Sequence, residues 1–408
     1  MFGVEFGYLT NTCVAVLTVI LFFYWYSMRN HDFWKNRGVP YIKISPFYWA
    51  LTEIGKKHLH DIEQERYEKY GKMYGYLEFN RPLLSVADPD LIRDILVKDF
   101  QTFNSRRVFV TGNEIFDKMV SVMKGDEDWK RIRSIITPTF TTGKIKKMMS
   151  ILKDCSNTVV RNFKELSGKG QYIDAKRLYG TYTMDVIASS AFSTKIDSHN
   201  DPDNRFVQNA SRVFNQKINW RLIVLFMFPF LTKIFKIDFF PGEVMEFFKQ
   251  ITIEIMEERK RTGQTRNDFL QLLMDTAKEV VEEPCAEEKG GDIASNYGVQ
   301  EDINPHILKS VTSKKLSMNE LVSQCVIFFI GGYDTTASTL SFATYFLAVN
   351  PEVQGKAREE VDQAIKEADG ELTNEGIQKM KYLDNVISET LRMYPPLIRY
   401  WKLLKPSY

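Results

Sequence analysis

Apolar residues along this chain recur mainly with helical spacing, and strand-like alternation is confined to one segment. That segment is 74–86, where two β-prone runs flank Asn80 and predict a hairpin. Asp88 and Pro89 then predict a helix start, because Asp caps helices and Pro fits their first turn. The pattern therefore predicts a mainly α fold with a small β region.

The first apolar segment predicts a membrane anchor. Residues 6–28 carry no charged side chain, and about 20 apolar residues are enough to cross a bilayer as helix. Basic residues follow the segment, so the amino terminus is predicted to lie outside and the rest in the cytosol. A cleaved signal peptide is the alternative, but no basic leading region or small-residue cleavage site supports it. The predicted organisation is an anchor (1–28), a linker (29–45) and one globular domain (46–408).

Two further segments stand outside the helical pattern. Residues 222–231 are apolar but too short to span a membrane, and Lys233 and Lys236 follow them among aromatic residues. A segment lying in the membrane interface and a buried loop-helix both fit this pattern. Residues 278–315 are rich in Glu, Gly and Ser without apolar periodicity, and they predict a solvated surface loop that contains Cys285.

The longest predicted helix begins at a capping box, residues 317–320, and ends near residue 349. Its length of roughly 45–50 Å would cross an entire domain, which is typical of a buried central helix. Asn350 and Pro351 predict the start of the next helix. Thr373 begins another segment, and residues 382–393 form the last clear helix.

The centre of the long helix, residues 328–336, reads FFIGGYDTT. Each glycine costs a helix about 1 kcal/mol against alanine, and a buried acid or hydroxyl costs more unless it is paired. The glycines would let a flat ligand approach the backbone. Asp334 and Thr335 could then pass protons into a dry pocket. The alternative is a pair of helix-packing glycines beside a satisfied Asp, and the pattern alone leaves both readings open.

Two residue pairs share helical faces. Glu389 and Arg392 stand at i and i+3, and Trp129 and Arg133 at i and i+4. A buried Arg could present its fork to a carboxylate or phosphate. Solvated surface pairs are equally consistent with the spacing of both.

Composition narrows the function classes. The 54 basic and 52 acidic residues give a net charge of +2, which indicates neither nucleic acid nor a strongly acidic partner. The four cysteines include no C-x-x-C pair, and no H-E-x-x-H arrangement occurs, so no protein-built metal cage is predicted. The abundant aromatic residues suit a large core or an apolar ligand cavity.

Seven strings, taken in order, resemble the cytochrome P450 family, and most of all its microsomal drug- and steroid-oxidising branch. The resemblance covers roughly residues 30–400. The strings are FNSRR (103–107), DEDWKRIRSIITPTFTTGK (126–144), YTMDVIASSAF (182–192), NDFLQLLMD (267–275), FFIGGYDTTASTLSF (328–342), NPEVQGKAREEVD (350–362) and YLDNVISETLRMYPP (382–396).

The resemblance implies roles for the central turn. Gly331 and Gly332 would mark a widened turn where oxygen binds over the haem. Asp334 and Thr335 resemble the acid–alcohol pair that delivers protons during oxygen activation. Residues 222–240 match the membrane-dipping region through which lipophilic substrates reach the site.

It also implies roles on other helices. Arg106, Trp129 and Arg133 resemble the groups that neutralise the haem propionates. Glu389 and Arg392 resemble the pair that fixes the fold beneath the haem. The implied cofactor is haem b, and the implied partners are NADPH–cytochrome reductase and a cytochrome b-type donor. The resemblance also implies a lipophilic substrate. It implies a location in the endoplasmic reticulum membrane, with a single span and the globular part in the cytosol. No nucleic-acid partner is expected.

The family's iron ligand is a cysteine in the pattern F-x-x-G-x-R-x-C-x-G, and none of the four cysteines has that context. We therefore expect a P450 fold lacking its C-terminal haem-binding part. The function implied by the family is a haem-dependent monooxygenase that inserts one oxygen atom into lipophilic substrates, with this chain inactive alone. The alternative is a non-catalytic, truncated form that acts as a membrane-bound binding module.

Overall fold

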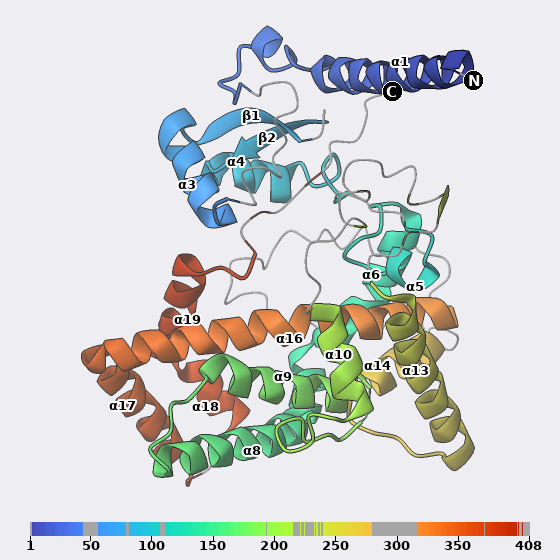
Figure 1. Cartoon of the computed structure of the whole chain (residues 1–408). Coiled ribbons are helices and arrows are strands. Elements are labelled where there is room, and N and C mark those ends of the chain that lie inside the picture. Colours follow the sequence, from blue (N-terminus) through green and yellow to red (C-terminus); the bar gives the residue numbers. More distant parts are fainter. Residues whose placement is uncertain are drawn as a thin grey trace. The chain divides into compact units, whose positions relative to one another are not determined.

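A computed structural model of the chain gives a mainly helical protein with one two-stranded sheet among the residues it describes (Figure 1). The chain divides into two compact units, residues 1–103 and residues 104–408. The boundary between them falls inside the predicted globular domain, residues 46–408. The structure describes residues 2–43, 56–78, 81–106, 111–192, 194–214, 221, 224, 232, 234–235, 237, 240–279, 316–370, 372–397, 399 and 402. Of the predicted loop 278–315, residues 280–315, with Cys285, lie outside this set, as do nearly all of 222–231. The first two residues of that predicted loop are instead the end of the helix Phe269–Glu279.

The first unit contains the predicted hairpin. Its elements are α1 (Phe2–Met28), η1 (Lys35–Arg37), α3 (Leu59–Tyr70), β1 (Met73–Glu78), β2 (Arg81–Val86), α4 (Pro89–Arg93) and η2 (Asp94–Lys98). The strands pair antiparallel, which confirms the hairpin. The Asp88 carboxylate accepts the backbone N–H groups of Asp90 and Leu91, which confirms the predicted cap. Within the described part of the chain, no helix combines the length and the apolar character needed to cross a membrane.

Gly75 is required in β1 for steric reasons. The indole ring of Trp34 covers its backbone, and a Cβ at residue 75 would lie 2.4 Å from that ring. The indole N–H of Trp34 donates to the Tyr76 carbonyl at 3.1 Å, which holds the ring in place. The segment after α1 is therefore fastened to the hairpin.

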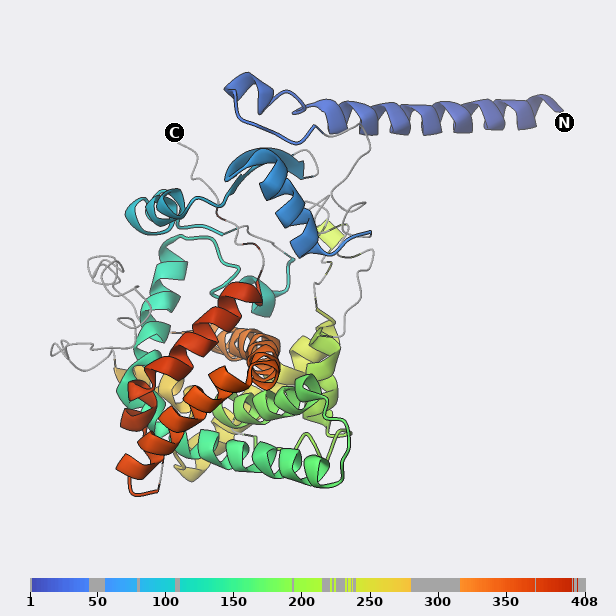
Figure 2. The same cartoon turned by 90° about the vertical axis from the view of Figure 1, so that its left-hand side faces the viewer.

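The second unit is helical throughout its regular elements. They are α5 (Glu114–Asp117), α6 (Glu127–Ile136), η3 (Thr137–Phe140), α7 (Thr142–Lys147), α8 (Met149–Gly168), α9 (Ala175–Ala191), α10 (Arg205–Phe214), α13 (Gly242–Thr262), α14 (Phe269–Glu279), α16 (Met318–Val349), α17 (Pro351–Glu367), α18 (Asn374–Lys379) and α19 (Lys381–Met393). Figure 2 looks almost along α16, with α8 and α9 (green) on one side and the red C-terminal helices on another. The predicted central helix is thus confirmed, with its ends as expected.

Local signals explain most helix ends. Ser317 and Glu320 form the predicted capping box. Thr373 caps α18 with its hydroxyl. Asn350 precedes α17 as predicted, but its side chain caps nothing there; it donates back to the Phe346 carbonyl at 2.8 Å.

Four buried phenylalanines form the centre of the core around α16: Phe192, Phe206, Phe248 and Phe329. Their rings meet at centroid distances of 5.3 or 5.4 Å along the Phe192–Phe206, Phe192–Phe248, Phe206–Phe248 and Phe248–Phe329 contacts. Edge-to-face and tilted contacts at this range add stability beyond area burial. The cluster fixes α16 one turn before Tyr333.

A buried acid on α9 makes stability depend on pH. Burial raises the pKa of Asp185 from 3.8 to about 6, although hydrogen bonds from Ser198 oppose this effect. The folded protein therefore binds the proton of the Asp185 carboxyl group more tightly than the unfolded chain does. This proton binding stabilises the fold at low pH, and the stabilisation is lost as pH rises through about 6. We expect Asp185→Asn, which keeps the acceptor for Ser198, to flatten the fall in unfolding free energy between about pH 4 and 7. Urea unfolding at several pH values measures this, and an unchanged pH slope would contradict the assignment.

Candidate functional site

The central turn of α16 has two unlike glycines. A Cβ added at Gly331 would meet nothing within 4 Å, whereas one at Gly332 would lie 2.9 Å from the Ile187 Cδ1 of α9. Gly331 therefore faces open space, and Gly332 serves helix packing. The helix-packing interpretation therefore holds at Gly332, and the approach of a flat ligand at Gly331 stays a prediction. Helix α16 runs as regular α-helix through both glycines, without the widened turn that the resemblance implied.

Asp334 and Thr335 point to different surroundings. The Thr335 hydroxyl donates to the Gly331 carbonyl, one turn back on the open side. The Asp334 carboxylate is 55% exposed and pairs with the Lys176 Nζ of α9 at 2.6 Å. The same ammonium donates to the Ser338 hydroxyl at 2.5 Å. The Asp334 carboxylate thus has direct access to solvent and pairs with Lys176. The Thr335 hydroxyl instead donates to the backbone of its own helix.

The predicted pair on α6 is also divided. Trp129 is half-buried and donates its indole N–H to the Val120 carbonyl at 3.0 Å, while Arg133, one turn later, is exposed. Sequence spacing correctly placed both residues in one helix, one turn apart. It gave no sign that the indole N–H would be used inside the protein.

Arg106 is exposed, and the residues before it dock on the start of α6. The Gly125 N–H donates to the Ser105 hydroxyl at 3.1 Å, and a Cβ at residue 125 would lie 2.6 Å from the Asn104 side chain. Gly125 directly precedes Asp126, the N-cap of α6. The docking therefore holds the segment of Arg106 against the beginning of that helix.

Positive charge gathers near Arg106. Burial, and then repulsion from Arg106, lowers the pKa of Lys402 below its ordinary value. The two positive charges are therefore close enough to interact.

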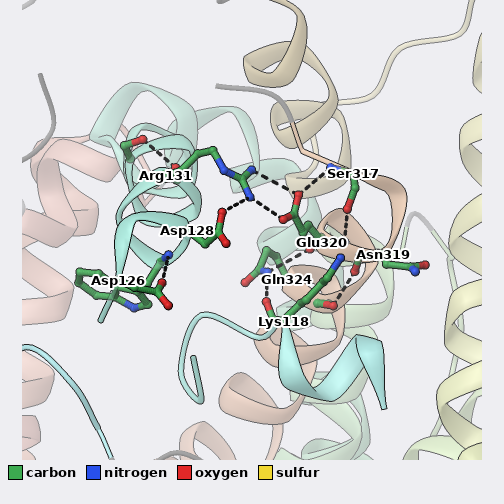
Figure 3. A network of polar contacts seen from close by, with 11 residues as sticks. Lys118, Asp126, Asp128, Arg131, Ser317, Asn319, Glu320 and Gln324 are labelled. Atoms are coloured by element: carbon green, nitrogen blue, oxygen red, sulfur yellow. Dashed lines mark hydrogen bonds and ion pairs between the residues drawn. The ribbon is translucent and has the colours of Figure 1, made fainter. Parts of the chain in front are cut away.

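A polar network joins α6 to the first turns of α16, and we call it the α6–α16 clamp (Figure 3). Its ion pair joins Arg131 to Glu320 with bonds of 2.6 and 3.3 Å. Burial acts to raise the pKa of Glu320, but donors from Arg131 and Ser317 hold it below the ordinary value. Gln324 completes the clamp by binding the Lys118 carbonyl at 2.8 Å and the Val120 N–H at 3.1 Å. These contacts link residues about 200 positions apart, and no local sequence signal marked them.

Glu389 and Arg392 form the predicted pair on α19. The guanidinium binds both carboxylate oxygens at 2.7 Å, in a bidentate geometry. Both side chains are exposed, at 61% and 67%, so the pair lies at the surface.

The described cysteines do not form a thiolate site. Cys325 is fully buried in the core, and burial raises its pKa. Burial, followed by Asp185 and Asp154, raises the pKa of Cys155 to about 11. Cys13 belongs to α1 of the first unit. Among the described residues, no group of three His, Cys, Asp or Glu side chains is arranged to hold a metal ion.

Comparison with known proteins places these features in a family. The family model for cytochrome P450 matches residues 39–402. The chain belongs to the cytochrome P450 family. Cytochrome P450 3A18 of Rattus norvegicus is 34% identical over 391 residues, covering 94% of this chain and 72% of the relative. Cytochrome P450 3A6 of Oryctolagus cuniculus is 35% identical over 391 residues, with the same coverage. The predicted family is confirmed.

The cofactor implied for a P450 is haem, and some of the described residues have the space or the charge that would suit one. Gly331 leaves space beside α16 for a flat ring. The docked Arg106 and the exposed Arg133 offer guanidinium groups to acidic substituents. The described cysteines, by contrast, offer no thiolate to the iron.

Proposed function

We propose that this P450 is a haem-dependent monooxygenase that inserts one oxygen atom from O2 into lipophilic substrates. The observation that carries the proposal is the open face of α16 at Gly331, where the Thr335 hydroxyl donates to the Gly331 carbonyl. When bound, the haem supplies dioxygen activation, with electrons from NADPH–cytochrome reductase or a cytochrome b-type donor. The protein then has to hold the ring, keep the substrate side dry and supply protons.

Asp334 and Thr335 are assigned the proton supply. Asp334 is given the outer position in this supply because its carboxylate is 55% exposed and is held at the surface by Lys176. The Thr335 hydroxyl both donates and accepts, so it can pass a proton inward once it turns from the Gly331 carbonyl. Gly331 provides the room for that rotation, and Gly332 keeps α16 close to α9.

Holding the haem is assigned to the side chains around α6. Arg106 and Arg133 would neutralise the haem propionates as charged donors, and Trp129 would pack beside them. Glu389 and Arg392 would stabilise the surrounding fold.

A non-catalytic binding module is the second candidate. The chemistry of the described cysteines favours it, because burial raises the pKa of both Cys325 and Cys155. In either case we propose that α1 attaches the chain to the endoplasmic reticulum membrane. Its exposed apolar side chains support this, with Leu17, Leu21 and Trp25 all more than half exposed.

Haem titration of the full chain tests the proposal. Saturable binding of one haem, followed by Soret absorbance, is expected, and Arg133→Ala should weaken it about 10- to 100-fold because a charge-assisted bond is lost. Arg161→Ala, an exposed arginine of α8, is the matched control. No saturable binding, or equal effects of both variants, would contradict the haem site.

The same preparation separates the two candidates. Substrate oxidation with reductase, and a thiolate-type Soret band of the reduced carbon monoxide complex, support the monooxygenase. Bound haem without either result supports the binding module. Recovery in the membrane pellet after an alkaline wash is expected from attachment through α1, and recovery in the supernatant would contradict it.

A further inference from the structure

Gln324 occupies an unusual position in the α6–α16 clamp. Its side chain is fully buried, so its amide must find partners inside the protein. The amide nitrogen donates to the Lys118 carbonyl at 2.8 Å and to the Glu320 carbonyl at 3.0 Å. The amide oxygen accepts the Val120 N–H at 3.1 Å. This one side chain therefore fixes the 118–120 backbone from both ends.

Val120 connects Gln324 to Trp129. Its N–H is held by Gln324, and its carbonyl accepts the indole N–H of Trp129 at 3.0 Å. An indole has a single hydrogen to donate. While this bond holds, Trp129 meets a ligand through its ring, and the position of the ring follows the Val120 backbone.

A second link runs in parallel. Arg131, two residues after Trp129, forms the bidentate pair with Glu320, one turn before Gln324 on α16. Helix α6 is thus tied twice to the beginning of the helix that carries Gly331, once through Arg131 and once through Trp129 and the Val120 backbone. Figure 3 shows the Arg131–Glu320 pair and the bond from Gln324 to the Lys118 carbonyl.

We propose that Gln324 is a positioning residue for the ligand-facing side of α6: through the Val120 backbone it sets where the Trp129 ring lies. The inference rests on the proposed haem site. Gln324 itself would touch no ligand, but its contacts with the Val120 backbone would be coupled to ligand binding through Trp129. Substitutions of Gln324 and Trp129 should therefore have non-additive effects on binding.

The test compares Gln324→Met, which removes all three bonds at similar volume, with Asn319→Ala. Asn319 is the matched control because it binds Glu114 at 2.5 Å from the first turn of α16, away from Trp129. We expect Gln324→Met to weaken haem binding about tenfold, and Asn319→Ala to change it less than about threefold. In a Trp129→Phe background, the effect of Gln324→Met should fall below about threefold. Equal effects of the two variants, or an undiminished effect in the Trp129→Phe background, would overturn the proposal.

Fluorescence tests the link without added haem. The Trp129 emission is obtained by subtracting the spectrum of each protein's Trp129→Phe counterpart. A red shift is expected in Gln324→Met and none in Asn319→Ala, and the reverse result would refute the coupling. If the chain binds no haem at all, the proposed function fails while this measurement still decides whether Gln324 positions Trp129.

If Gln324→Met fails to fold, the unmodified chain provides the answer. Hydrogen exchange at the Val120 amide should slow several-fold when haem saturates the protein, because coupled sites stabilise each other reciprocally. An unchanged exchange rate would overturn the proposal.

Discussion

Replacing Asp268 by alanine is expected to lower the free energy of unfolding by about 3–5 kcal/mol, because it leaves a buried arginine without its carboxylate. Arg259 of α13 and Asp268, which precedes α14, are 7% and 0% exposed. The guanidinium binds both carboxylate oxygens, at 2.5 and 3.1 Å, and the Gln271 side chain at 2.9 Å. The pair also lies near the buried Cys325 of α16, so its loss would reach the central helix.

Urea unfolding of the full chain measures this effect. Glu165→Ala is the matched control, because it removes an ion pair of similar length to Lys169 that lies fully in solvent. Exposed pairs at i and i+4 contribute little, so the control should unfold almost as the unmodified protein does. If both variants lost equal stability, the buried pair would not be a principal stabilising contact.

Replacing Gly331 by leucine is expected to weaken haem binding at least about tenfold while the fold persists. The reason is steric, since a side chain there would occupy the open space proposed for the ring, and overpacking typically costs about 1–3 kcal/mol. Gly331→Ala is the control, because it adds only a Cβ with no neighbour within 4 Å. Alanine should raise the free energy of unfolding by up to about 1 kcal/mol through helix propensity.

Haem titration and urea unfolding of the same variants check this prediction. Gly332→Leu should behave oppositely, destabilising the fold through its contact with Ile187. Unimpaired haem binding by Gly331→Leu would place the ring elsewhere. Equal destabilisation at residues 331 and 332 would contradict the division of roles between the two glycines.

Much of the fold was predictable because its signals are local. The capping box at Ser317, the cap at Asp88 and the hairpin each depend on neighbours in sequence, so one-dimensional patterns sufficed. Helical periodicity likewise located α16. The family followed from the order of several strings.

The site was only partly predictable because its geometry depends on distant partners. Spacing located Trp129 but could not reveal that Val120 takes its indole N–H. Two adjacent glycines look alike in sequence, and only the position of α9 distinguishes them. The partner of Asp334 was missed because Lys176 lies 158 residues away, among many similar surface lysines.

That ion pair has a consequence for the conditions under which this P450 would work. Its two side chains are 48% and 55% exposed, so dissolved ions reach them. At an ionic strength of about 0.1 M, charges in water are screened beyond about 10 Å, and exposed contacts weaken further as salt is added. Rising ionic strength would therefore loosen the hold of Lys176 on Asp334, and buffer composition would set how often the carboxylate swings away from α9.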